Sequence, residues 1–133
     1  MSFVPEGLRQ IGKTDLRVSQ LGFGAAPFGN LMSSVSDEAT RATVDAAFAA
    51  GIRYFDTAPF YGHGLSEHRL GEGLRGRPRD SFVLSTKVGR LLKPDPRATT
   101  TGPFVAHPPF AIEYDYSRDG ALRSIEDSLQ RMG

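Results

Sequence analysis

Apolar and polar positions along this chain follow two periods, one typical of strands and one typical of helices. Residues Leu8 to Val18 alternate apolar and polar side chains around Gly12, which predicts a short β-hairpin that turns at the glycine. Residues Ser19 to Gly24 form a short apolar stretch that predicts a strand, and a loop containing Pro27 leads into a helical pattern from Asp37 to Ala50. The hairpin is therefore followed by one strand-helix unit.

The helical segment carries the usual start and stop signals. Ser36 can cap its first turn with the side-chain hydroxyl, and the acidic Asp37 and Glu38 suit the positive end of the helix. Gly51 ends the pattern. The apolar stripe expected to face inward consists of Val44, Ala47 and Phe48.

The strand-helix pattern then repeats. Residues Ile52 to Asp56 predict a second strand, and Ser66 begins a helical pattern that carries Leu70 and Leu74 and ends near Gly76. The pattern therefore predicts a second unit of the same kind as the first.

A third unit has a longer connection. Residues Ser81 to Val88 predict a strand, a proline-rich stretch runs from Gly89 to Tyr116, and a helix is predicted from about Ser117. The side chains that share one face of this helix are Leu122, Ile125, Leu129 and Met132.

Repeated strand-helix units imply parallel strands in an α/β layer or barrel. Three parallel strands cannot close a barrel, and a sheet of that size leaves edges and one face poorly covered. We therefore expect residues 1–133 to be part of one larger α/β layer or barrel domain whose remainder follows Gly133. The alternative is a small three-stranded domain that covers its edges by dimerising.

Composition narrows the class of protein by what it lacks. The formal net charge is +1 and no segment gathers like charges, so neither nucleic acid nor a charged membrane is an expected partner. The chain has no cysteine, which suits a reducing compartment and excludes disulfides and thiolate nucleophiles. No targeting segment or apolar run of membrane-spanning length is present, so we expect a soluble, cytoplasmic protein.

Three side chains with chemical potential follow the predicted strands. Asp56 ends the second strand, Tyr61 comes five residues later, and Lys87 occupies the end of the third strand. Carboxyl ends of neighbouring parallel strands meet at one edge, where barrel enzymes hold their catalytic groups. A buried lysine needs a counter-charge, which Asp56 can supply. A cation close to a phenol stabilises the phenolate, so Tyr61 is the candidate acid/base.

Each of these residues also has a structural interpretation. Asp56 could cap a strand end, Tyr61 could anchor a loop, and Lys87 could extend its ammonium group to solvent. Their joint placement at equivalent ends of successive strands favours the catalytic interpretation.

The segments around these residues resemble the aldo-keto reductase family. Two segments show this resemblance most clearly: GIRYFDTAPFYGHGLSEHRLGEGL, and the STKVG that contains Lys87. The resemblance extends from the hairpin at Leu8 through LGFGAAPFGNL to DYSRDGALRSIEDSLQRMG, and it is closest to the aldose 1-dehydrogenase branch, which includes L-fucose, L-galactose and pyridoxal 4-dehydrogenases. The residues that match the family's first signature are Gly51, Arg53, Asp56, Thr57, Ala58, Tyr61, Glu67 and Gly71.

This resemblance implies a (β/α)8 TIM barrel, of which this chain would be the amino-terminal portion: a β-hairpin that plugs the barrel bottom and about three βα units. It implies NAD or NADP bound across the carboxyl face of the strands. The implied reaction is hydride transfer, either oxidation of an aldose at C1 to a lactone or interconversion of an aldehyde and an alcohol.

The resemblance also implies residue roles. Tyr61 would donate or accept the proton, and Lys87 would tune the acidity of Tyr61. Asp56 would hold Lys87 while lying close to the nicotinamide ribose. The nicotinamide end of the cofactor would be lined by Gly24, Ala25 and Ala26, since small residues allow close approach of a ligand. An apolar wall against the substrate is expected from Phe28, Phe60 and Leu92.

The family's fourth catalytic residue is a histidine on the strand after the helix that ends near Gly133, and this chain does not contain it. The histidines that are present, His63, His68 and His107, are expected in loops or on a surface helix, away from catalysis. His63 and His68 bracket a loop-helix junction with no third ligand, so no metal site is expected. We therefore expect residues 1–133 to be inactive on their own.

Two stretches invite other interpretations. GFGAAPFG follows a strand but lacks the GxGxxG spacing, so it is not a dinucleotide fingerprint. Residues Lys93 to Pro109 resemble a linker in composition, but the units on either side make them a long, mobile active-site loop.

Two alternatives to an enzyme stay open. Potassium-channel β subunits resemble the same family and use the barrel for binding, so a non-catalytic regulatory subunit is one. A truncated product without a function of its own is the other.

Overall fold

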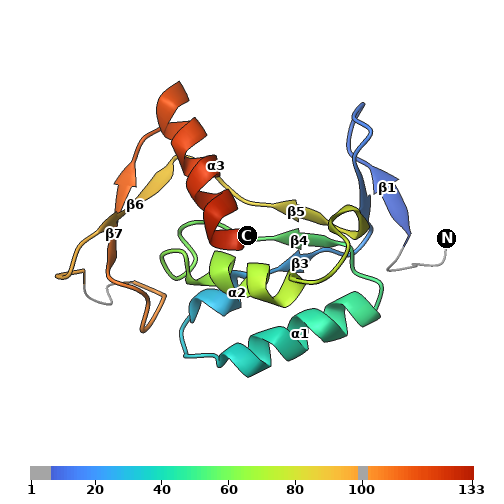
Figure 1. The fold of residues 1–133 in the computed structure, drawn as a ribbon, viewed down its shortest axis with the longest axis horizontal. Helices are drawn as coiled ribbons and strands as arrows, with labels where there is room; N and C mark the ends of the chain where they lie inside the picture. Colours follow the sequence, from blue (N-terminus) through green and yellow to red (C-terminus); the bar gives the residue numbers. More distant parts are fainter. Residues whose placement is uncertain (1–6, 99–101) are drawn as a thin grey trace.

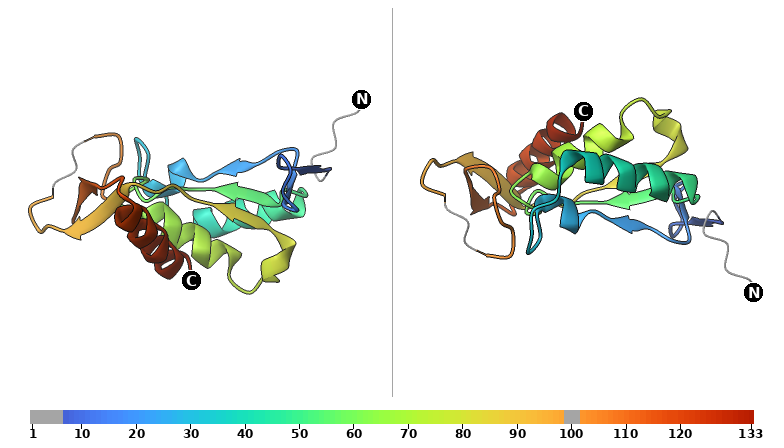
Figure 2. Two further views of the ribbon diagram at one scale, coloured as in Figure 1. Left: turned by 90° about the horizontal axis from the view of Figure 1, so that it is seen from above. Right: turned by 90° about the horizontal axis from the view of Figure 1, so that it is seen from below.

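The computed structural model describes residues 7–98 and 102–133, and its elements follow the expected order. A three-stranded parallel sheet forms the centre, with strand order β3-β4-β5, and helices α1 and α2 lie on one of its faces (Figure 1). One antiparallel hairpin lies at each end of this sheet, as Figure 2 also shows. The strands and helices in chain order are β1 Leu8–Gln10, β2 Arg17–Ser19, β3 Phe23–Gly24, α1 Asp37–Ala49, β4 Tyr54–Asp56, α2 Leu65–Leu74, β5 Val83–Ser85, β6 Arg90–Pro94, β7 Phe110–Tyr114 and α3 Arg118–Met132, with short 3-10 helices η1 at Ala26–Gly29 and η2 at Arg79–Ser81.

The parallel sheet confirms the predicted strand-helix units, although its ladders are shorter than the apolar stretches that predicted them. Gly24 of β3 is the register partner of Asp56 of β4, which in turn pairs with Ser85 of β5. These three residues form one row at the carboxyl end of the strands. The β1–β2 hairpin is also confirmed, with Leu8 opposite Ser19, and it precedes the amino end of β3.

Helix α1 forms for the reasons visible in its sequence. The Ser36 hydroxyl accepts a hydrogen bond from the backbone N–H of Ala39, and Val44 and Ala47 are buried as expected. Gly51 has a φ of 87°, a left-handed conformation that favours glycine after a helix end.

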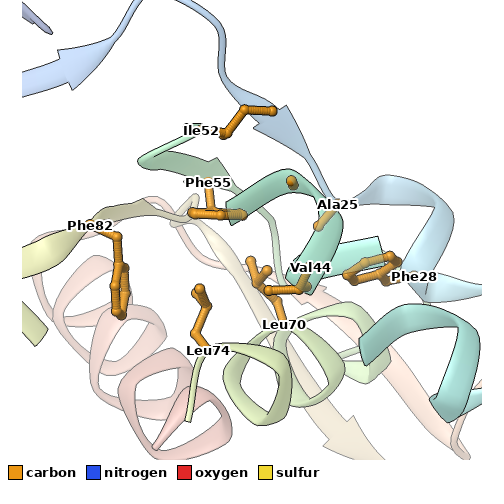
Figure 3. Packing of buried hydrophobic residues seen from close by; sticks show 9 residues of the cluster. Ala25, Phe28, Val44, Ile52, Phe55, Leu70, Leu74 and Phe82 are labelled. Atoms are coloured by element: carbon orange, nitrogen blue, oxygen red, sulfur yellow. The ribbon is translucent and has the colours of Figure 1, made fainter. Parts of the chain in front are cut away.

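The hydrophobic core lies between the sheet and helices α1 and α2 (Figure 3). Phe55 of β4 is fully buried, and its ring meets that of Phe82 edge-on with centroids 6.4 Å apart. Phe28 belongs to this core and is 3% exposed. The members of the core are Ala25, Phe28, Val44, Ala47, Ile52, Phe55, Leu70, Leu74 and Phe82.

Of the residues on the predicted apolar face of helix α3, Met132 is buried, but both leucines are exposed. Its buried residues are Gly120, Ser124, Ser128 and Met132, whereas Leu122 is 45% and Leu129 60% exposed. Small side chains let α3 approach its neighbours: a Cβ on Gly71 of α2 would collide with the backbone of Met132. Close helix packing, rather than the apolar stripe, therefore determines which face of α3 is buried.

The proline-rich stretch 89–116 is not only a loop, which corrects the sequence interpretation. Strands β6 and β7 pair antiparallel over five residue pairs, from Arg90 opposite Tyr114 to Pro94 opposite Phe110. The apolar residues of both strands lie between polar ones and prolines, so the strand pattern is short and weak in the sequence. Part of the connection between the strands, residues 99–101, lies outside the described residues.

No helix within residues 7–98 and 102–133 combines the length and apolar character needed to cross a membrane.

Candidate active site

The three predicted catalytic residues lie together at the carboxyl end of the parallel strands. Asp56 is the last residue of β4, and Lys87 follows β5 by two residues. Lys87 Nζ donates to Asp56 Oδ2 at 2.7 Å and to the carbonyl oxygen of Thr57 at 2.9 Å. The Lys87 and Asp56 side chains are 49% and 34% exposed, so the ion pair lies at the surface of this edge, accessible to a small molecule.

The second oxygen of Asp56 is also held in place. Asp56 Oδ1 accepts a hydrogen bond of 2.6 Å from the Ser85 hydroxyl, and Ser85 is the register partner of Asp56 in the sheet. The Tyr54 hydroxyl lies 3.1 Å from Ser85 Oγ. Both carboxylate oxygens therefore have partners on β5 or just beyond it, which fixes the orientation of the carboxylate.

Tyr61 lies in the loop between β4 and α2, with the centre of its ring 4.9 Å from Lys87 Nζ. Two glycines allow this loop to pass close to η1: a Cβ on Gly29 would lie 2.5 Å from the Gly62 nitrogen, and Gly62 has a φ of 63°. The loop conformation thus depends on residues without side chains, and it places the phenol beside the ammonium group.

The charge of Lys87 is stable in this setting. Burial lowers the pKa of Lys87, but hydrogen bonding and electrostatic attraction to Asp56 and Tyr61 raise it by more, so its pKa is above the usual value. Lys87 therefore remains a cation at neutral pH, as a group that stabilises a phenolate must.

A cavity of about 270 Å³ opens beside Tyr61 and Lys87. Phe60, a predicted substrate contact, lines this cavity. Residues after Lys87 also line it, and the sequence did not predict them as substrate contacts. The Arg90 guanidinium lies 4.4 Å from the ring centre of Phe60 and 5.3 Å from that of Tyr114. The full lining is Ala58, Pro59, Phe60, Tyr61, Lys87, Val88, Arg90 and Tyr116.

The other two predicted substrate contacts lie elsewhere. Phe28 packs in the core, and Leu92 lines a separate cavity of about 440 Å³ together with His63 and Arg131. Leu92 lies in β6, opposite Ile112 of β7, and this second cavity is not lined by Tyr61. No periodicity in the sequence signals this placement.

The predicted cofactor residues differ in what they can offer to a ligand. Ala25 is fully buried. Its N–H donates to the carbonyl of Asp56 and its carbonyl accepts from the Ser66 hydroxyl, so both of its backbone polar groups are already paired within the chain. Gly24 is exposed, and a Cβ built on it would meet nothing within 4 Å. Gly24 and the half-buried Ala26 therefore present the accessible surface next to Asp56.

His63 and His107 lie in loops, as expected, but both rings are half-buried and in contact with each other. Their rings stack with centroids 3.7 Å apart, and His63 Nδ1 lies 2.6 Å from the carbonyl oxygen of Phe110. His68 is exposed on α2. Within residues 7–98 and 102–133, no group of three histidine or carboxylate side chains is arranged to hold a metal ion.

The fold agrees with comparisons to known proteins. The model of the aldo/keto reductase family matches residues 20–133. The chain belongs to the aldo/keto reductase family.

Particular relatives confirm the branch expected from the motifs. The chain is 46% identical to D-threo-aldose 1-dehydrogenase of a Pseudomonas species over 89% of its length, and 43% identical to pyridoxal 4-dehydrogenase of Microbacterium luteolum over 94%. It covers 37% and 39% of these relatives. The chain therefore spans little more than a third of the length of the curated relatives it matches.

A solved structure confirms the fold class, a portion of a (β/α)8 barrel. The holo form of an aldo-keto reductase from Bacillus halodurans aligns with a TM-score of 0.70 and 33% identity, over 94% of this chain and 36% of that one.

Proposed function

We propose that this chain contributes the catalytic Tyr61, Lys87 and Asp56 of an NAD(P)-dependent oxidoreductase that oxidises an aldose at C1 to a lactone. The observation that carries the proposal is the position of Lys87 Nζ, 2.7 Å from Asp56 Oδ2 and 4.9 Å from the ring centre of Tyr61. The similarity to D-threo-aldose 1-dehydrogenase supports the choice of an aldose.

Tyr61 takes the proton of the C1 hydroxyl as the C1 hydrogen leaves as hydride, so that the lactol becomes a lactone. Lys87 stabilises the phenolate form of Tyr61 that accepts this proton. Asp56 keeps the ammonium group in place, and the Ser85 hydroxyl orients Asp56. In the reverse direction, Tyr61 returns the proton to the carbonyl oxygen.

A bound nicotinamide supplies the hydride acceptor. The residues present fit its nicotinamide end, since Gly24 leaves open space in the same row as Asp56. Gly24, Ala26 and Asp56 would hold that end, with the fully buried Ala25 shaping the backbone beneath.

The experiment is Tyr61→Phe in the full-length product of the reading frame, assayed with L-fucose, L-galactose and pyridoxal, each with NAD+ and NADP+. We expect turnover to fall by about 10²–10⁴-fold, the usual contribution of a general acid/base, while nicotinamide-fluorescence titration shows retained cofactor binding. Unchanged turnover would overturn the proposal.

We further propose that residues 1–133 alone do not turn over substrate. The described histidines make other contacts: His63 and His107 stack on each other, and His68 is exposed on α2. Purified chain 1–133 should show no nicotinamide reduction under conditions in which the full-length product does, and measurable turnover by this chain would contradict this point.

A further inference from the structure

Two neighbouring side chains in the first turn of α2 reach the ends of all three parallel strands. Ser66 donates its hydroxyl hydrogen to the carbonyl of Ala25, which follows β3, at 2.6 Å. The same hydroxyl lies 2.9 Å from Thr57 Oγ1, just after β4. Ser66 and Thr57 are both fully buried, so these hydrogen bonds do not compete with water.

Glu67 makes the third connection. Its Oε1 accepts a hydrogen bond of 2.7 Å from the hydroxyl of Thr86, which follows β5. Its Oε2 accepts one of 2.5 Å from Arg131 Nε of α3. Glu67 is fully buried, and a buried carboxylate is costly unless it is paired and hydrogen-bonded. Arg131 supplies the positive counter-charge for Glu67, and the Thr86 hydroxyl supplies the hydrogen bond that links Glu67 to the end of β5.

Each connected strand residue adjoins a group of the candidate site. Thr57 follows Asp56, and its carbonyl accepts a hydrogen bond from Lys87. Thr86 immediately precedes Lys87. The first turn of α2 therefore holds the residue that follows Asp56 and the residue that precedes Lys87.

We propose that Ser66 and Glu67 are positioning residues, which set the separation of Asp56 and Lys87 and so the distance from the ammonium group to Tyr61. The inference rests on the proposed function. The Asp56 and Lys87 side chains are themselves partly exposed, so their geometry needs support from a rigid, buried layer. Shifting either strand end moves Lys87 relative to the phenol, which weakens phenolate stabilisation without removing any group that touches substrate.

The test removes the hydroxyl of Thr86 rather than the charge of Glu67, because Glu67→Gln leaves Arg131 unpaired and risks loss of folding. In the full-length product we expect Thr86→Val to lower kcat by about 10–100-fold, the cost of a small misplacement, with KM nearly unchanged. The pH profile of kcat should shift to higher pH, because a displaced Lys87 stabilises the phenolate less. Thr86→Ser, which keeps the hydroxyl, should restore both values.

Ser128→Ala is the matched control. Ser128 is fully buried and its hydroxyl accepts a hydrogen bond from Arg131 of the same helix rather than from a strand end. The Ser128→Ala variant should have a lower thermal midpoint of unfolding and an unchanged pH profile of kcat. If Thr86→Val lowers only the thermal midpoint, as Ser128→Ala does, the positioning role is wrong.

Tyr61→Phe, measured in parallel, separates the two proposals. If Tyr61→Phe abolishes turnover while Thr86→Val leaves kcat and its pH profile intact, only the positioning role fails. If Tyr61→Phe retains turnover, the proposed function itself fails, whatever Thr86→Val does.

Discussion

The ring of His63 stacks on the ring of His107, with an interplanar angle of 18° and centroids 3.7 Å apart. His63 lies two residues after Tyr61, and His107 belongs to the connection between β6 and β7. The stack therefore joins the loop that carries the candidate acid/base to the connection between β6 and β7. His63 also holds a left-handed φ of 49°, so the backbone adopts an uncommon conformation to make this contact.

This histidine pair predicts a stability that falls in mild acid. Burial lowers the pKa of His63, the hydrogen bond to the Phe110 carbonyl raises it, and the charge on His107 lowers it, with a net lowering from the usual 6.5. The unfolded chain therefore binds a proton at a pH where folded His63 is still neutral. The free energy of unfolding should decrease as the pH falls through about 6.5 and should lack this dependence well above it.

Urea unfolding of the full-length product at a series of pH values from about 8 to about 5 measures this dependence. His63→Asn, in which Asn tolerates the left-handed backbone, should flatten this dependence, whereas His68→Asn, at an exposed position of α2, should not. An equal slope in the parent and His63→Asn would show that the pair is not responsible.

The buried Glu67–Arg131 pair predicts a large loss of stability when its cation is removed. Arg131→Met leaves a fully buried carboxylate without a counter-charge, so we expect the free energy of unfolding to drop by about 3–5 kcal/mol. Arg75→Met is the matched control, since Arg75 pairs with Glu72 on the same helix but the side chains are 66% and 55% exposed. The control should change stability by less than about 1 kcal/mol. Similar effects in denaturant titrations of both variants would contradict the assigned burial of the Glu67 pair.

The cavity beside Tyr61 predicts a role for Tyr116 in substrate affinity. Tyr116 lines this cavity and is 72% exposed, so its ring offers an apolar face to the C–H face of a sugar. In the full-length product, Tyr116→Ala should raise KM for the aldose several-fold with kcat little changed, and Tyr116→Phe should behave like the parent.

Tyr114→Ala controls for effects on the aromatic stack alone. Tyr114 is 63% exposed and its ring centre lies 6.3 Å from that of Tyr116, but it does not line the cavity. The role of Tyr116 would be refuted if both alanine variants raised KM equally, or if neither did.

The amino-acid sequence by itself determined the three strand-helix units and the meeting of Asp56, Tyr61 and Lys87. These features depend on local periodicity and on a general rule, that neighbouring parallel strands end at the same edge of a sheet. The Ser36 cap and the buried stripe of α1 also follow from residues that are close in sequence.

Only the tertiary structure decided how distant segments meet. Glu67 bonds Arg131 across 64 positions, and His63 bonds the Phe110 carbonyl across 47; neither contact has a local signature. The same holds for Arg90 and Tyr116, which the pairing of β6 with β7 brings to the cavity beside Tyr61. The period of apolar residues in a helix or strand indicates which face of the element is buried. The burial of a polar side chain instead depends on the hydrogen-bond partner that the folded chain places beside it.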